Sequence, residues 1–310
     1  MNQRVTGRFA PTPSGRLHLG NLLCCLLAYL SVRSQDGRFL LRIEDLDVPR
    51  CPERLSLQAI EDLRWFGFRW DEEPLWQSRR SAVYQQHLDQ LQQKGLIYPC
   101  FCTRAQLMAS VAPNLGDTQV VYQRTCASLT AEKIQQFSKV RNPAMRMRVP
   151  DEVICFEDGL YGPQAENLST DCGDFILRRS DGLFGYQLAV VVDDALSSVN
   201  EVVRGRDILT ATPRQIYLLR ELGFSVPEYI HIPLLMDADG RRLAKRDKDL
   251  DLTALSRRFT AEELLGKLAY SAGILDVERP ASMDELIRLF DWSRIKREDM
   301  RLPRSLTADI

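Results

Sequence analysis

The sequence predicts an α/β protein built on a doubly wound parallel sheet, and three features near its beginning predict it. A short strand pattern over 4–10 is interrupted by Pro11 and Pro13. An apolar helical stretch follows from about 17 to 32, and an almost wholly apolar run over 39–43 predicts a second, buried strand. A strand, a turn, a helix and a strand in this order form the first unit of such a sheet.

Two amphipathic helices are expected after this unit, near 54–66 and 79–94. The segment from Cys100 to about Arg141 has three cysteines and no long periodicity, which is typical of an inserted module rather than of a continuing sheet. Alternating patterns in "AMRMRV" and "VICFEDGLYG" then predict strands.

The sheet is expected to resume later in the chain. The run "QLAVVVDD" (187–194) predicts a buried strand, and a helix is expected over 212–222. "PLLMDADGRRLA" predicts a hairpin that turns at Asp239 and Gly240. We therefore expect a main domain over 1–97 and 170–250, an inserted module over 98–169, and a helical tail over 251–310.

The composition is that of an ordinary globular protein, with 310 residues, 45% apolar and 27% charged. The longest apolar run covers nine residues, 22–30, which is far less than a membrane span needs. With 41 basic and 42 acidic side chains, no global charge attracts nucleic acid. Eight cysteines without an export signal favour reduced thiols or metal ligands, so we expect a cytoplasmic protein.

The stretch "RFAPTPSGRLHLGN" (8–21) places His18 and Gly20 at the start of the first predicted helix. A helix amino terminus offers unpaired N–H groups and partial positive charge, and glycine allows a phosphate to approach the backbone. An imidazole there can donate to a phosphate oxygen whose charge grows during a reaction. Taken alone, the same stretch also fits a capped structural helix.

A second stretch, "RRLAKRDK" (241–248), has five basic residues among its eight. From a loop after the predicted hairpin, Lys245 could close over a polyphosphate. The alternative is an exposed basic loop, which is what most charge runs are.

The two stretches together resemble the paired "HIGH" and "KMSKS" motifs of the class I aminoacyl-tRNA synthetases, in the glutamate and glutamine branch. The resemblance implies a Rossmann-type catalytic domain, with His18, Asn21 and Lys245 as catalytic residues. The departures are Asn21 for the last histidine, Arg242 for the first lysine and Ala244 for the first serine. The resemblance implies that ATP is bound by His18, Gly20, Asn21, Arg242 and Lys245.

An acidic amino acid brings two carboxylates and one ammonium, which a buried site must pair with opposite charges. Charged side chains at predicted strand ends could do this, because ligands of a doubly wound sheet bind at the carboxyl ends of its strands. Each of these residues could instead have a purely structural role. The resemblance assigns glutamate binding to Arg8, Phe9, Ala10, Pro11, Thr12, Glu44, Tyr186 and Arg204.

Cys100 and Cys102 form a C-x-C pair, and Cys126 follows after 23 residues. Thiolates at such spacing bind structural zinc and can fix loops that lack a core of their own. None of the three histidines lies nearby in sequence, so the fourth ligand is either Tyr122 or a water molecule. The C-x-C…Y-x-x-x-C arrangement resembles that of a short relative of glutamyl-tRNA synthetase, in which the tyrosine completes the site.

Since only about sixty residues follow Lys248, we expect no further domain for reading an anticodon. This form, together with the cysteine arrangement, resembles the glutamyl-queuosine tRNA(Asp) synthetase family. The resemblance implies that L-glutamate is activated with ATP and Mg²⁺ and then transferred to queuosine at the wobble position of tRNA(Asp). We expect a monomer with no membrane association. The alternatives are a shortened glutamyl-tRNA synthetase that charges an acceptor end, and a catalytically silent relative that binds tRNA. Candidate RNA-binding cations are Arg146, Arg148, Arg178, Arg179 and Arg206.

Overall fold

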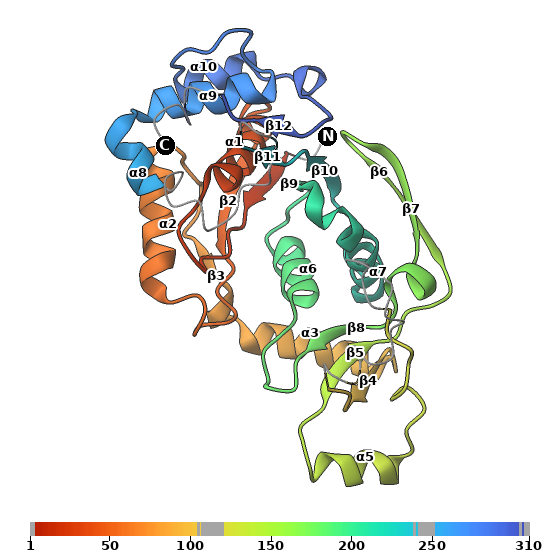
Figure 1. Cartoon of the computed structure of the whole chain (residues 1–310). Coiled ribbons are helices and arrows are strands. Elements are labelled where there is room, and N and C mark those ends of the chain that lie inside the picture. Colours follow the sequence, from red (N-terminus) through yellow and green to blue (C-terminus); the bar gives the residue numbers. More distant parts are fainter. Residues whose placement is uncertain are drawn as a thin grey trace.

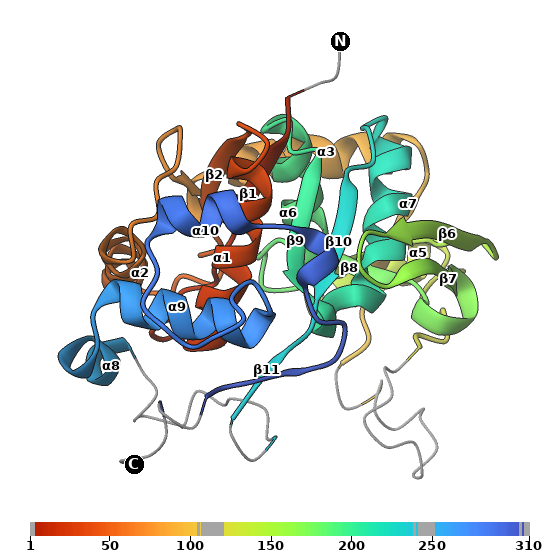
Figure 2. The ribbon, with the colours of Figure 1, turned by 90° about the horizontal axis from the view of Figure 1, so that it is seen from above.

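The computed structural model describes residues 4–103, 106, 121–237, 240, 252–303 and 306. Its parallel strands form two ladders that meet side by side (Figures 1 and 2). The first has the order β1-β2-β3 and is parallel throughout. The second has the order β7-β6-β10-β9, with β10 parallel to both its neighbours and β7 antiparallel to β6. The strands of the two ladders are β1 (Thr6–Phe9), β2 (Arg38–Ile43), β3 (Leu75–Trp76), β6 (Val153–Asp158), β7 (Gly162–Asn167), β9 (Glu201–Gly205) and β10 (Glu228–Ile232).

The two ladders join where β1 lies beside β9. The backbone N–H of Asn200, just before β9, donates to the carbonyl of Thr6 at 3.0 Å. The side-chain oxygen of Asn200 accepts from the N–H of Thr6 at 2.7 Å. These contacts lie at the amino ends of β1 and β9, near the carboxyl end of α1, where the Ser31 hydroxyl donates to Glu201. The cavity described below opens at the opposite, carboxyl ends of the two strands.

Helices cover both faces of the ladders, as predicted for a doubly wound sheet. Alternate residues of β2 face two different hydrophobic cores, with Phe39, Leu41 and Ile43 in one and Leu40 in the other. The first core also contains α1 and α9, and the second contains α6 and α7. The helices are α1 (Leu19–Arg33), α2 (Glu53–Trp65), α3 (Ser81–Gln93), α5 (Ala131–Ser138), α6 (Tyr186–Leu196), α7 (Thr212–Leu222), α8 (Leu252–Arg258), α9 (Ala261–Ala272) and α10 (Met283–Leu289).

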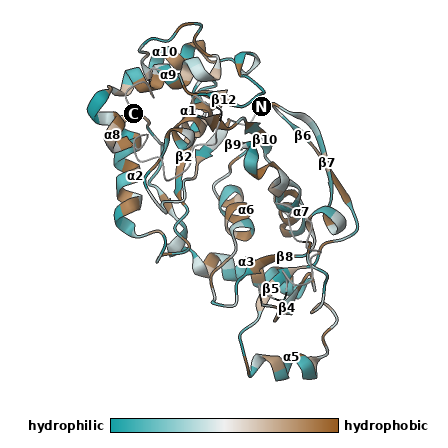
Figure 3. Cartoon of the chain, viewed as in Figure 1, coloured by the Kyte–Doolittle hydropathy of each residue, from teal (hydrophilic) through white to brown (hydrophobic). Residues whose placement is uncertain are grey.

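The prediction of a strand over 187–194 is wrong, because these residues form α6. Residues 188–194 are all buried, so the helix has no polar face along this stretch to reveal its period. Figure 3 shows the apolar character of α1 and α6 in the interior. Since a continuous apolar run is compatible with either a buried strand or a buried helix, the pattern alone could not distinguish them.

A separate antiparallel sheet contains β4 (Ile97–Cys100), β5 (Ala144–Met147) and β8 (Phe175–Arg178). Strands of the predicted insertion over 98–169 therefore pair with strands outside it, including β6 with β10. The division into domains stays a prediction.

The hairpin predicted after residue 233 is described only in part, so it stays a prediction. β11 (Leu235–Met236) pairs in parallel with β12 (Met300–Arg301) from the end of the chain. Of the predicted turn, Asp239 lies outside the described residues. None of the helices that the structure describes is long and apolar enough to cross a membrane.

Candidate active site

A cavity of about 340 Å³ opens at the carboxyl ends of β1, β2 and β9, where the two ladders meet. Ligand sites of doubly wound sheets form at such a junction. The structure brings together all the residues predicted for glutamate and one predicted for ATP, although their roles stay predictions. These lining residues are Arg8, Phe9, Ala10, Pro11, Thr12, Asn21, Glu44, Tyr186 and Arg204.

A second cavity of about 270 Å³ adjoins the first. The two cavities share Thr12, Glu44 and Tyr186 in their linings. Tyr186 is the first residue of α6 and lines both cavities. The site therefore has room for a second reactant beside the first.

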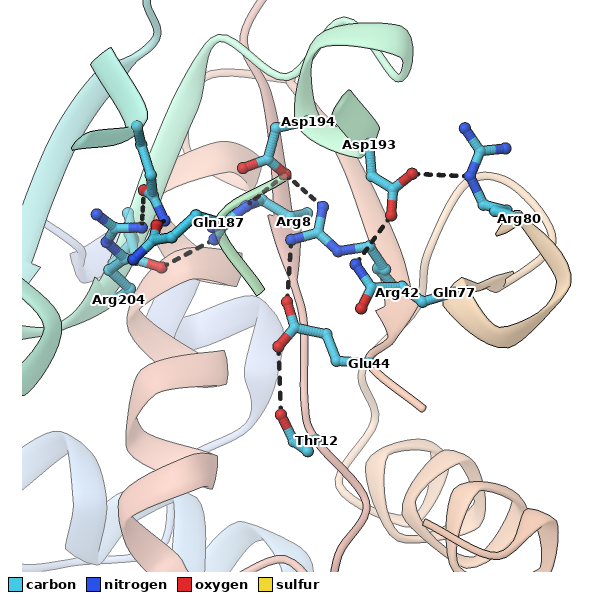
Figure 4. Close-up of polar contacts among 12 residues, drawn as sticks. Arg8, Thr12, Arg42, Glu44, Gln77, Arg80, Gln187, Asp193, Asp194 and Arg204 are labelled. Carbon is cyan, nitrogen blue, oxygen red and sulfur yellow. Dashed lines mark hydrogen bonds and ion pairs between the residues drawn. The ribbon is translucent and has the colours of Figure 1, made fainter. Parts of the chain in front are cut away.

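A buried charge network holds the floor of the first cavity (Figure 4). The Arg8 Nε donates to the Asp194 Oδ1 at 3.1 Å, and Arg42 donates to the same oxygen. The other Nη of Arg42 lies 3.2 Å from the Glu44 Oε1. The Thr12 hydroxyl donates to the remaining Glu44 oxygen, also at 3.2 Å. Two arginines and two carboxylates thus fix one another at the ends of β1 and β2.

The two carboxylates of this network differ in their pKa. Burial raises the pKa of Glu44 above its ordinary value, and the attraction of Arg42 and Arg8 only partly offsets it. Burial also acts on Asp194, but Arg42 and Arg8 outweigh it and lower the pKa of Asp194. Glu44 is therefore the carboxylate that would gain most from an additional cation in the cavity.

The HLGN stretch caps α1. The Nδ1 of His18 accepts from the backbone N–H of Gly20 at 3.1 Å and of Asn21 at 3.4 Å. The Asn21 side-chain oxygen accepts in return from the N–H of His18 at 3.2 Å, which completes a capping box. Because Nδ1 accepts, the ring proton of neutral His18 is on Nε2.

Gly20 is packed closely against this cap. A Cβ at this position would lie 3.0 Å from the Cε1 of His18, closer than ordinary contact allows. Of the three residues His18, Gly20 and Asn21, only Asn21 lines the cavity. His18 is the N-cap residue, and Gly20 lies in the first turn of α1. The second predicted motif, with Arg242 and Lys245, lies outside the described residues.

The predicted metal ligands form one cluster. The sulfur atoms of Cys100, Cys102 and Cys126 all lie within 4.8 Å of one another. The Tyr122 hydroxyl lies 3.4 Å from the Cys100 sulfur and 3.5 Å from the Cys102 sulfur, and it accepts from the Cys126 N–H at 2.9 Å. The cluster could hold a metal ion.

The basic residues proposed for RNA already have partners inside the protein. Arg146 is buried, stacks on the Tyr122 ring and donates to the Asp174 carbonyl at 2.7 Å. Arg206 pairs with Asp299 at 2.6 Å. Arg146 is therefore a structural residue, which corrects the interpretation of it as an RNA contact.

Sequence reasoning did not identify several residues that support the site. Arg42 and Asp194 hold the network, and Asp158 and His231 lie behind Arg204. The sequence could have revealed two of them. Arg42 lies within an apolar run and Asp194 at the end of one, and a charge buried in such a run requires a partner of opposite charge.

The junction cavity, the capped α1 and the charged strand ends define the catalytic domain of a class I tRNA synthetase. The family described as tRNA synthetases class I (E and Q), catalytic domain, matches residues 4–265. The glutamate–tRNA synthetase of Elizabethkingia anophelis has a similar structure, with a TM-score of 0.85 at 25% identity. The match covers 98% of this chain and 69% of that one.

Relatives of the same length identify the branch. The glutamyl-Q tRNA(Asp) synthetase of Symbiobacterium thermophilum is 47% identical over 98% of both chains. That of Nitratidesulfovibrio vulgaris is 42% identical over 97% of both chains. The chain belongs to the glutamyl-Q tRNA(Asp) synthetase family.

Proposed function

We propose that this protein activates L-glutamate with MgATP to give glutamyl-adenylate and pyrophosphate, and transfers the glutamyl group to queuosine at the wobble position of tRNA(Asp). The observation that carries the proposal is the cavity in which Arg8, Arg204 and Glu44 surround one space at the junction of the ladders. Two guanidinium groups and one carboxylate match the two carboxylates and one ammonium of glutamate. The family of its full-length relatives supports the same reaction.

The first step requires the α-carboxylate of glutamate to attack the α-phosphate of ATP. In this proposal the arginines hold the carboxylates, and Glu44 pairs with the ammonium. The His18 Nε2–H donates to the phosphate as charge grows on it, and Lys245 and Mg²⁺ share the charge of the polyphosphate. Holding the reactants in line can supply about 7–11 kcal/mol of the barrier.

In the second step a hydroxyl of the queuosine cyclopentenediol attacks the activated carbonyl and AMP leaves. The acceptor must therefore reach the glutamyl group from outside the first cavity. The adjoining cavity of about 270 Å³ supports this arrangement, because it shares Thr12, Glu44 and Tyr186 with the first.

The proposal includes a structural zinc ion held by Cys100, Cys102, Cys126 and Tyr122. Zinc–sulfur bonds of about 2.3 Å in a tetrahedron separate the sulfur atoms by about 3.8 Å. The Cys102 and Cys126 sulfurs are 3.6 Å apart, which fits this distance. The tyrosine oxygen lies near all three cysteines, as a fourth ligand must.

One set of assays tests the proposed reaction. We expect glutamate-dependent exchange between ATP and pyrophosphate without tRNA, and glutamylation of tRNA(Asp) only when it carries queuosine. Glutamylation of the acceptor end of tRNA(Glu) would instead support a shortened glutamyl-tRNA synthetase. An absence of exchange under all conditions would support a silent tRNA-binding relative.

Replacing Lys245 with alanine tests the second motif. We expect pyrophosphate exchange to fall about 100-fold, because one charged donor to the reacting phosphates is lost. Thermal denaturation checks that the variant is folded, and we expect its midpoint to stay within about 2 °C of the wild type. Unchanged exchange in a folded variant would contradict the assignment of Lys245.

Replacing Glu44 with glutamine should weaken glutamate binding without destabilising the fold. We expect the KM for glutamate to rise about 10- to 100-fold, because the substrate ammonium loses its partner. The pKa of Glu44 is raised in the folded state, so its charged form destabilises the fold at neutral pH. E44Q should therefore be at least as stable as the wild type at pH 7.

The same variant makes a prediction about pH. A carboxyl with a raised folded-state pKa stabilises the fold when protonated, and this stabilisation is lost as pH rises from the unfolded pKa through the folded pKa. The gain in free energy of unfolding of E44Q over the wild type should therefore shrink as the pH falls through the range between the folded and unfolded pKa of Glu44. Unfolding in denaturant at several pH values measures it, and an advantage that grows on acidification would contradict the prediction.

A further inference from the structure

Arg204 is held from behind by three acceptors. It lies near the end of β9 and is 4% exposed, yet it lines the first cavity. Its Nε donates to the His231 Nε2 at 2.9 Å, one Nη to the Gln215 side-chain oxygen at 2.6 Å, and the other Nη to the Thr212 hydroxyl at 2.7 Å. A guanidinium has five N–H donors, so these contacts leave two for a ligand.

His231 is the acceptor that fixes Nε, and it lies directly opposite Arg204 in the pairing of β10 with β9. Its side chain is fully buried. The His231 Nδ1 lies 2.6 Å from the Asp158 Oδ2, at the end of the neighbouring strand β6. Three adjacent strands thus contribute Asp158, His231 and Arg204 in turn.

Asp158 is itself fixed by the backbone. It accepts from the N–H groups of Leu160 at 3.1 Å, Tyr161 at 2.9 Å and His231 at 3.1 Å. Both of its oxygens are therefore occupied by donors, and it is only 1% exposed. A carboxylate this well satisfied has little freedom to rotate.

The direction of the hydrogen bonds follows from the chemistry of the three groups. An ionised carboxylate only accepts and a guanidinium only donates. His231 must therefore carry its proton on Nδ1 and present a bare Nε2 to Arg204. Burial and the nearby Arg204 lower the pKa of His231 despite its bond to Asp158, which agrees with a neutral ring.

We propose that Asp158 and His231 are positioning residues that select one ring tautomer and thereby hold the Arg204 guanidinium in the orientation that binds a carboxylate of the amino-acid substrate. The inference rests on the proposed function, since it assigns the cavity an acidic ligand. Neither residue lines the cavity, so both act through Arg204.

The tautomer can be measured without any activity assay. The chain has only three histidines, His18, His87 and His231, so long-range ¹H–¹⁵N spectra of the full-length protein can assign each ring. We expect His231 to carry its proton on Nδ1 in the wild type. In Asp158→Asn, the side-chain amide must place its NH₂ either against the ring or against the backbone donors. A shift of the proton to Nε2 is expected, which would break the bond to Arg204.

The KM for glutamate then tests whether the His231 tautomer affects substrate binding. D158N and H231L should raise the KM for glutamate about 10- to 100-fold in pyrophosphate exchange, with the KM for ATP within about twofold. H231Q keeps a neutral acceptor and should recover glutamate affinity to within about threefold of the wild type. If H231L does not fold, D158N and H231Q carry the comparison, because both keep nearly the native side-chain volume.

A matched control removes a buried hydrogen bond elsewhere. The Ser31 hydroxyl donates to Glu201 at 2.8 Å near the far end of α1, and S31A should lower the thermal midpoint without changing the KM for glutamate. Wild-type His231 protonated on Nε2, or D158N with an unchanged glutamate KM, overturns the positioning role. A wild type without glutamate-dependent exchange contradicts the proposed function instead, so the two failures are distinguishable.

Discussion

Replacing Asp194 with asparagine is expected to reduce kcat/KM for glutamate activation by more than about 1,000-fold and to lower the free energy of unfolding by about 3–5 kcal/mol. One oxygen of Asp194 accepts from both Arg8 and Arg42, all of them buried. Asparagine keeps the shape and an acceptor but removes the charge. Arg42 then keeps Glu44 as a carboxylate partner, whereas Arg8 loses the carboxylate that fixes it at the cavity.

Denaturant unfolding and pyrophosphate exchange measure the two effects. The pKa of Asp194 is lowered by Arg42 and Arg8 against the effect of burial, so its charge stabilises the fold above the unfolded pKa. That contribution disappears as pH falls through the folded pKa, and the difference between D194N and the wild type should shrink with it. Glu61 on α2 is exposed, and E61Q provides a charge-matched control expected to stay within about 0.5 kcal/mol. A variant as stable and active as the wild type would show that the network has no role in the site.

Asp194 also illustrates what the sequence could not reveal. Arg8, Glu44 and Arg204 line one cavity because each lies near the carboxyl end of a parallel strand, and such ends converge at one edge of the sheet. This convergence depends only on strand order and direction. The residues brought together by the fold were therefore predictable even though their contacts were not.

The supporting residues were missed because they depend on side-chain contacts between distant segments. Arg42 and Asp194 are 152 positions apart, and Asp158 and His231 are 73 apart. The wrong prediction of a strand over 187–194 also hid the role of Asp194 in the charge network. In a strand, Asp193 and Asp194 would lie on opposite faces of the sheet, so only one of them could be buried with the site. In α6 both are buried, and Asp193 instead accepts from Arg80, Gln77 and Tyr84. Helical periodicity was hidden by burial on all sides.

The residues of the cysteine cluster, unlike Arg42 and Asp194, could be identified from the sequence. Spacing alone identified Cys100, Cys102 and Cys126, because a C-x-C pair restricts two thiols to one neighbourhood. The proximity of Tyr122 could not follow from spacing. The structure brings its hydroxyl within 3.5 Å of Cys100 and Cys102 and stacks Arg146 on its ring, with 3.9 Å between guanidinium carbon and ring centre.

Replacing Cys126 with alanine should therefore abolish binding of the proposed zinc ion and disorganise the segment around it. The small core of this region consists of Tyr98, Cys100, Phe101, Tyr122 and Cys126, so residues of the proposed metal site make up most of it. Without the metal, little apolar contact remains to fix these loops. We expect zinc to fall from one ion per chain to almost none, and the thermal midpoint to fall by at least about 10 °C.

Elemental analysis and thermal denaturation measure these changes, and Cys155→Ala is the matched control because Cys155 is exposed on β6, outside the cluster. Tyr122→Phe separates the two candidates for the fourth ligand. If the tyrosine oxygen binds the metal, Y122F should weaken zinc binding about 10- to 100-fold in competition with a chelator, whereas a water ligand would leave the affinity nearly unchanged. The metal site would be contradicted by a wild-type protein that contains no zinc and keeps its thermal midpoint in the presence of a chelator. The cluster would then be stabilised by packing of the thiols and by the Tyr122 hydroxyl alone.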